Sequence, residues 1–233
     1  MQKFWTTNNY ALTNNILYTL YVANKYDIEI SKIAIQKIFY LSQVLNPLRE
    51  IAHQIVEFVK YFRGPYSKNV QNELDHLCSY GLVELVKFEV RNGKNSVAVY
   101  KISLGGINAV SELTKYSKEE DQFWWISTIL RTCNLFFDDQ VFSNKKNEYE
   151  GFDNIVNLVY QDPTFRDYES NNLRSLMKFD GDTPTATIIK NTIDHLGNDS
   201  RLKDLDYKHL VELLVVGYFN YLYGKYVEVY AAD

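Results

Sequence analysis

A turn, one short amphipathic helix and a hairpin follow one another in residues 61–103, and this succession constrains the fold more than any other feature. A Gly-Pro pair marks the turn, and Ser67 stands where a helix N-cap belongs. Apolar residues then recur at helical spacing until Gly81, which is typical of a helix stop. Two β-branched runs, 82–90 and 96–103, flank an Asn-Gly turn and predict a β-hairpin. This order predicts the middle of a winged helix, with the hairpin as the wing.

Helical patterns occupy most of the remaining sequence. The expected helices cover residues 10–25, 32–45, 47–61, 104–116, 117–137, 152–160, 164–178, 184–196 and 206–226. We therefore expect a mainly α fold with a small β-hairpin: an N-terminal winged helix-turn-helix domain at 1–116 and an all-helical partner-binding domain at 117–233. The last helix is apolar on nearly all sides, which predicts burial in its own domain or in a partner.

The charge of the chain is unevenly distributed. The formal net charge is −4, which argues weakly against a dedicated nucleic-acid binder. Residues 31–103 carry ten basic and six acidic side chains, which leaves 15 basic and 23 acidic side chains elsewhere. The expected winged helix is therefore the basic part of an acidic protein.

Cysteine usage and hydropathy indicate the compartment. Cys78 and Cys133 form no CxxC motif, and the N-terminal residues lack the layout of a signal peptide. No apolar run is long enough to span a bilayer. We expect a cytoplasmic protein with no membrane association.

No catalytic or cofactor motif stands out in the sequence. The phosphate-binding, dinucleotide-binding, nucleophile-elbow and HExxH patterns are missing. Acidic residues gather between 138 and 153, but no histidine accompanies them, and a solvated loop explains them better than a metal site. Asp206 and His209 lie one helical turn apart without a nucleophile motif. We expect no enzyme activity, no cofactor and no metal.

DNA contact is one possible use of the basic segment. The outward face of the helix 67–80 carries one lysine against two carboxylates, and phosphate contacts supply most of the affinity for DNA. The wing and the turn offer better candidates. The candidate DNA-binding residues are Lys60, Arg63, Lys68, Lys87, Arg91 and Lys94. The alternative is a winged helix that binds protein, with solvated wing charges.

Aromatic side chains in the C-terminal half are the candidates for partner binding. Adjacent tryptophans cannot both face one core from a single helix, so one of Trp124 and Trp125 is expected to meet another domain or chain. Aromatics at helical spacing otherwise belong to a core. The candidate partner-binding residues are Trp124, Trp125, Tyr218, Tyr221 and Tyr223.

Two short segments resemble known bacterial winged-helix families. Residues 32–41 resemble the lysine-leucine-glutamine-lysine helix of the YwgA-like and SocA-like (Panacea) proteins. Residues 62–67, together with Leu77 and the run 81–83, are similar to their glycine-proline turn and following helix. The resemblance covers residues 31–103 and implies the winged-helix fold.

The layout of the whole chain resembles a second family. A winged helix followed by a helical half is similar to the middle component of ABC-three-component (Lamassu-type) anti-phage defence systems. That resemblance implies a non-enzymatic accessory subunit that bridges an SMC/ABC-type ATPase and an effector nuclease in a hetero-oligomer. The alternative function is a DNA-binding transcriptional regulator or antitoxin.

Overall fold

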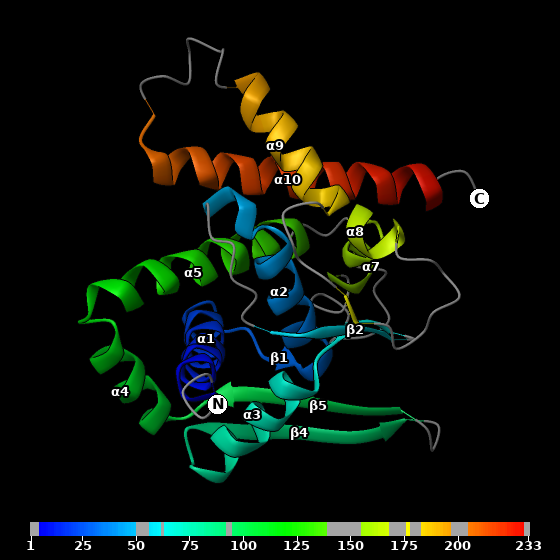
Figure 1. The fold of residues 1–233 in the computed structure, drawn as a ribbon. Coiled ribbons are helices and arrows are strands. Elements are labelled where there is room, and N and C mark those ends of the chain that lie inside the picture. Colours follow the sequence, from blue (N-terminus) through cyan, green and yellow to red (C-terminus); the bar gives the residue numbers. More distant parts are fainter. Residues whose placement is uncertain are drawn as a thin grey trace.

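The computed structural model describes residues 5–49, 56–61, 63–91, 95–138, 155–167, 176–177, 183–196 and 205–230. In these residues the chain is mainly helical and carries two small antiparallel sheets (Figure 1). One sheet has the strand order β1-β5-β4 and the other has the order β3-β2-β6. None of the described helices combines the length and apolarity needed to cross a bilayer.

Two helices begin the fold. Helix α1 covers Trp5–Lys25 and α2 covers Lys32–Val44, so both predicted N-terminal helices are confirmed. Strand β1 (Ile30–Ser31) precedes α2, and the Ser31 hydroxyl caps that helix by accepting from the backbone N–H of Ala34 at 3.1 Å. Helix α2 is buried along nearly its whole length, with Ile35, Ile38 and Leu41 fully shielded from solvent.

The predicted helix and the antiparallel pairing of the two hairpin strands are confirmed. The turn predicted at the Gly-Pro pair is wrong, because Gly64 and Pro65 belong to a strand, β3 (Gly64–Tyr66). Helix α3 covers Lys68–Ser79, and Ser67 caps it by accepting from the backbone N–H of Val70 at 3.5 Å. Gly81 follows with φ +70°, a backbone conformation that glycine adopts readily. Strands β4 (Val83–Arg91) and β5 (Asn95–Ile102) then pair antiparallel.

The helix predicted for residues 47–61 is wrong. A short 3-10 helix, η1, covers Asn46–Arg49, and residues 58–61 form strand β2 (Phe58–Tyr61). Strand β2 pairs with β3 (Gly64–Tyr66) on one side and with β6 (Leu176–Met177) on the other. These partners supply the hydrogen bonds that favour a strand over a helix here. The helix predicted for 164–178 is likewise too long, because α8 ends at Asp167 and β6 follows.

Three polar side chains of α2 fix the chain around this second sheet. The amide of Gln43 donates to the carbonyl of Val56 at 2.7 Å and accepts from its N–H at 3.0 Å. The amide of Gln36 makes the same paired contact with the backbone of Ser67, at 2.9 and 2.8 Å. The Lys37 ammonium donates to the carbonyl of Pro65 at 2.8 Å. Helix α2 therefore positions the segment that leads into α3.

The C-terminal half adds six helices to the part of the chain that the structure describes. They are α4 (Leu104–Leu113), α5 (Ser117–Asp138), α7 (Ile155–Val159), α8 (Pro163–Asp167), α9 (Pro184–Leu196) and α10 (Tyr207–Tyr230). The predicted helices that begin near residues 104, 117, 184 and 206 are confirmed.

One hydrophobic core joins the two halves of the chain. Helix α5 packs against α1 and α2 and also against α10, while α7 packs against α2. Buried residues from both sides of residue 116 belong to one continuous cluster. The boundary drawn at 116/117 therefore does not separate two cores. In Figure 1, α10 and α9 lie across the end of the molecule opposite to β4 and β5.

The buried Lys37 predicts a pH dependence of stability. Burial lowers the pKa of Lys37 from its ordinary 10.5 to about 7. Between these values the unfolded chain binds a proton that the folded chain does not, so stability rises with pH through this window. The variant Lys37→Met should abolish this rise, which amounts to roughly 1 kcal/mol per pH unit between about pH 7 and pH 10.

Urea denaturation of the wild type and of Lys37→Met at several pH values measures this difference. Lys68→Met, which removes an exposed lysine, is the matched control. Parallel stability curves for the wild type and Lys37→Met would contradict the prediction. The unsatisfied carbonyl of Pro65 lowers the stability of the variant at every pH and leaves the slope unaffected.

Candidate protein-binding groove

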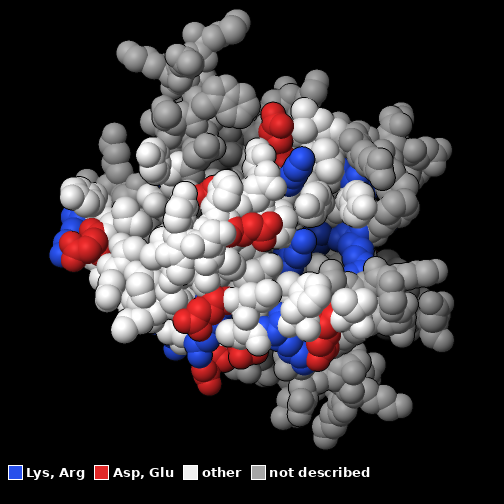
Figure 2. Space-filling view, turned by 90° about the horizontal axis from the view of Figure 1, so that it is seen from below, with Lys and Arg blue, Asp and Glu red and all other residues white. Residues whose placement is uncertain are grey.

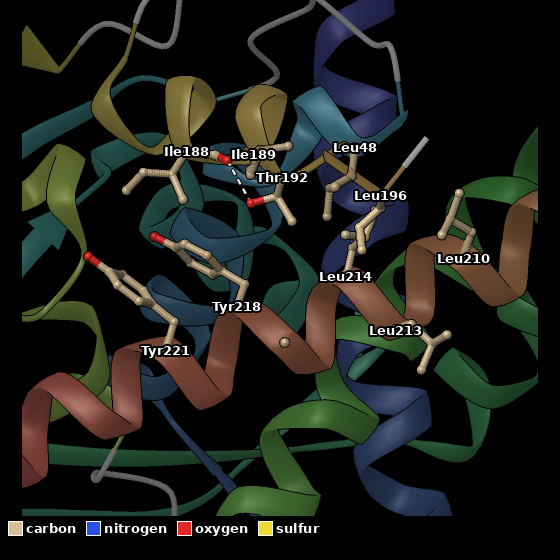
Figure 3. Close-up of a pocket in the computed structure, with 11 residues that line it drawn as sticks. Leu48, Ile188, Ile189, Thr192, Leu196, Leu210, Leu213, Leu214, Tyr218 and Tyr221 are labelled. Atoms are coloured by element: carbon tan, nitrogen blue, oxygen red, sulfur yellow. Dashed lines mark hydrogen bonds between the residues drawn. The ribbon is translucent and has the colours of Figure 1, made fainter. Parts of the chain in front are cut away.

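An apolar groove of about 370 Å³ lies between α9 and α10. Apolar side chains of both helices and one from η1 form most of its walls (Figure 3). The lining residues are Leu48, Ile188, Ile189, Thr192, Leu196, Leu210, Leu213, Leu214, Gly217, Tyr218 and Tyr221.

Local sequence places the two helices that form the groove. The Thr183 hydroxyl caps α9 by accepting from the backbone N–H of Ala186 at 3.2 Å, and Pro184 occupies the first helical position. The Asp206 carboxylate caps α10 by accepting from the backbone N–H of His209 at 3.1 Å. Gly217 lies on α10 within the groove, and apart from its chain neighbours and the backbone of α10 no atom comes within 4 Å of the position that a Cβ there would take. The missing side chain keeps the middle of the groove open.

The groove has a buried floor and an exposed rim. Ile189 and Tyr218 are nearly inaccessible, whereas Leu213 is 53% exposed and Tyr221 is 38% exposed. The Thr192 hydroxyl donates to the carbonyl of Ile188 at 2.8 Å, as the dashed line in Figure 3 marks. The groove therefore presents mainly carbon atoms, which suits apolar contacts and not acid–base chemistry.

A buried carboxylate holds the floor of the groove in place. The Asp162 side chain accepts from the Tyr40 hydroxyl at 2.5 Å, from the Thr185 hydroxyl at 2.9 Å and from the backbone N–H of Phe165 at 3.0 Å. It also accepts a short hydrogen bond from the Tyr218 hydroxyl. These donors come from α2, α8, α9 and α10, so one side chain connects four helices.

Burial determines the protonation of this network. It raises the pKa of Asp162, while the four hydrogen bonds act in the opposite direction. Burial, and then the nearby carboxylate, raise the pKa of both Tyr40 and Tyr218 well above the ordinary value. Both phenols therefore stay protonated and donate to Asp162. The network is saturated by groups of the chain itself, which indicates a structural role.

The structure places the candidate DNA-binding residues in different environments. Lys60 is buried, and its ammonium lies 3.3 Å from the carbonyl of Phe165 and 5.0 Å from the centre of its ring. Lys60 is therefore no surface contact for DNA, which corrects that assignment. Arg63 and Lys68 are exposed, whereas Lys87 forms an ion pair with Glu89 at 2.7 Å. The side chain of Arg91 and the whole of Lys94 lie outside the described residues.

Acidic side chains accompany the basic ones around α3. Asp75 accepts from the Gln71 amide at 2.7 Å, and Glu73 accepts from the Thr13 hydroxyl at 2.5 Å. Figure 2 shows a mainly white surface on which red and blue atoms lie close together in several places, with one short blue stretch toward the right. The basic character expected of residues 31–103 does not produce a broad, uniformly positive surface in this view.

The candidate partner-binding residues divide into core and surface. Trp125 is 1% exposed and its indole N–H donates to the carbonyl of Ser42 at 3.2 Å, so it belongs to the core. Tyr218 is also buried, although it forms part of the groove floor. Trp124 is half-buried; its indole N–H donates to Glu212 at 3.2 Å and its ring lies 5.1 Å from the Lys208 ammonium. The burial of Trp125 corrects its assignment as a partner contact and follows from the packing of α5 against α1, α2 and α10.

The remaining tyrosines lie near the groove. Tyr221 stands at its rim, with its ring centre 6.0 Å from that of Tyr218, and Tyr223 is half-buried against the core. The sequence alone did not indicate the other lining residues of α9, notably Ile188 and Ile189. The signal that could have found the groove is the glycine at 217 inside an otherwise apolar helix.

Metal-site geometry is missing from the described residues. No three His, Cys, Asp or Glu side chains in them approach closely enough to hold an ion. The predicted acidic loop lies almost wholly outside the described residues. His209 contacts the Asp206 carboxylate in full exposure to solvent, as expected for a capped helix start.

Comparison with known proteins gives no assignment. The chain matches no protein-family model, and no curated protein matches it.

Removal of one hydroxyl from the groove floor tests the Asp162 network. Tyr218→Phe should lower the free energy of unfolding by about 2 kcal/mol, because a buried carboxylate loses a donor. Tyr221→Phe, at the exposed rim on the same helix, should change it by less than about 0.5 kcal/mol. Urea denaturation of both variants at neutral pH measures the difference, and equal effects would refute the structural role of the network.

Proposed function

We propose that this chain is a non-enzymatic accessory subunit of a bacterial multi-protein complex, and that the groove between α9 and α10 binds an apolar helix of a partner subunit. The observation that carries the proposal is the groove itself, with its apolar walls, its open middle at Gly217 and its exposed rim. Apolar grooves between helices are recurrent sites for the apolar face of a partner helix.

The length of the groove favours a helix as its occupant. Its α10 wall runs from Leu210 to Tyr221, which corresponds to about 16 Å of helix axis. That length matches about three turns of a partner helix, which would place side chains at positions i, i+3, i+4 and i+7 against the wall.

The proposed partner follows from the resemblance of the chain's layout to the middle component of three-component defence systems. A partner of that kind is an SMC/ABC-type ATPase, an effector nuclease, or both, in a cytoplasmic hetero-oligomer. The winged-helix assignment of residues 1–116 belongs to the same proposal and is supported by the order α2, α3, β4 and β5.

Partner binding is tested by co-expression of the tagged chain with its neighbouring genes and by mass spectrometry of the purified complex. We expect stoichiometric recovery of a partner subunit with the wild type, and at least about tenfold less with Gly217→Trp, which fills the groove, or Leu213→Lys, which charges its rim. Gly217→Ala leaves the groove open and Val227→Lys charges α10 beyond it, so both controls should retain the partner.

Two outcomes would contradict this proposal. A monodisperse chain recovered without any partner would exclude an accessory subunit of the neighbouring gene products. A partner retained equally by Gly217→Trp and Leu213→Lys would exclude the groove as the interface. Recovery of a small toxin would favour the antitoxin function.

DNA binding is the second candidate function. The observation that favours it is the exposure of two cations: Lys68 in the first turn of α3, where the helix dipole attracts phosphate, and Arg63 just before β3. We expect a DNA affinity that falls with salt and that weakens by about tenfold or more when Lys87, Arg91 and Lys94 are replaced together by Glu. Titration of labelled duplex DNA at two salt concentrations measures this effect, and an unchanged affinity would exclude the wing as a DNA contact.

A further inference from the structure

Strand β4 has an outer edge to which no other strand pairs in the described part of the chain. It is the terminal strand of the sheet β1-β5-β4, and in Figure 1 it lies near the bottom of the fold, with helix α3 close to one end of it. The backbone N–H and C=O groups along such an edge can pair with another strand. Soluble proteins usually protect edges of this kind with charges, bulges or covering elements. Strand β4 has one irregularity, between Leu85 and Lys87, and from Lys87 to Val90 its pairing with β5 is regular. This regular segment is available for pairing with another strand.

The side chains of β4 are unusually apolar for an exposed edge. Phe88 and Val90 are each 61% exposed, and Leu85 is 50% exposed. The opposite residues Ala98 and Tyr100 of β5 are buried, so the core ends between the two strands. The apolar face of the sheet therefore continues onto β4 without a cover from the described residues.

The order of charged residues along β4 favours pairing of this edge with β4 of a second copy of the chain. Lys87 and Glu89 flank Phe88 and lie on the opposite face of the strand from it. In an antiparallel pair of two β4 strands centred on Phe88, Lys87 of each copy lies opposite Glu89 of the other. The same register places Phe88 beside Phe88, within the regular part of the strand.

Other registers of the same strand are less favourable. An antiparallel pair centred on Lys87 places lysine against lysine, and one centred on Glu89 places carboxylate against carboxylate. A parallel pair in register opposes like charges at both positions. Like charges directly opposite each other destabilise a sheet, so the sequence favours the register centred on Phe88.

We propose that β4 is a self-association surface, through which two copies of this chain join their sheets by antiparallel pairing of β4 about Phe88. Lys87 and Glu89 form an ion pair at 2.7 Å within each copy. In the dimer each of these side chains also lies opposite the oppositely charged one of the other copy. The interface uses none of the groove residues of α9 and α10, so it does not depend on the proposed function.

Charge reversal tests the register. Sedimentation velocity over a concentration series should show a monomer–dimer equilibrium for the wild type. Lys87→Glu and Glu89→Lys should each weaken dimerisation by about tenfold or more, because each opposes like charges twice. A mixture of these two variants should form a heterodimer, and the double variant Lys87→Glu/Glu89→Lys should dimerise like the wild type.

Disulfide trapping tests the same register without altering charge. In a Cys78→Ser background, Phe88→Cys should form a cross-linked dimer on mild oxidation, since opposed residues in an antiparallel pair are close enough for a disulfide. Val90→Cys is the matched control, with the same exposure, and should not cross-link because its two copies lie about 14 Å apart.

Three results would overturn the proposal. They are a wild type that stays monomeric at every concentration, a mixture of the charge variants that does not associate, and a cross-link that forms equally at 88 and 90. Loss of self-association in Leu213→Lys, with retention in Lys87→Glu, would assign self-association to the groove instead. Circular dichroism of each variant establishes that it is folded.

Discussion

The carboxylate of Asp162 is the contact on which the arrangement of the C-terminal helices depends. It lies in the core and receives hydrogen bonds from residues of α2, α8, α9 and α10. A buried carboxylate without donors would destabilise the fold by several kcal/mol, so all four helices must approach it together. The groove between α9 and α10 lies directly over this network, since Tyr218 belongs to both. The hydrogen bonds of this network therefore fix the shape of the groove floor, while the walls of the groove are apolar.

Helix α2 plays the corresponding role in the N-terminal half. Gln36 binds both the backbone N–H and the C=O of Ser67, and Gln43 binds the same two groups of Val56. Such paired hydrogen bonds fix the position of the bound backbone more closely than apolar packing does. Lys37 adds a third contact at Pro65 and lies 3.0 Å from the place of a Cβ on Gly64. Gly64 also has φ +86°, so both conformation and space favour glycine there. The segment 32–41 and the Gly-Pro pair are thus parts of one structural unit.

Local signals predicted the fold where neighbouring residues determine it. Ser67 and Gly81 each act within a few residues, and the helix between them and the strand pair that follows are present. Strand β2 was missed because its partners include residues 176–177, which are remote in sequence. Burial of Lys60 and Trp125 likewise depends on distant carbonyl groups, at Phe165 and Ser42. The groove arises where two helices diverge, so the pattern of either helix alone could not reveal it, although Gly217 marks its position.

The two proposed binding surfaces, the α9–α10 groove and the edge of β4, select their partners through different interactions. Apolar burial is nearly non-directional, so a groove selects an occupant mainly through its shape and length. A strand edge adds directional backbone hydrogen bonds, and the alternation of Lys87 and Glu89 adds a charge register. Because β4 and the α9–α10 groove lie at opposite ends of the fold, occupation of one leaves the other open (Figure 1). A dimer formed through β4 would present two grooves. A partner with two copies of the bound helix would then bind both grooves, and the distance between the grooves would set the effective concentration of the second binding event. Weak contacts at each groove would in that case be sufficient for a stable assembly.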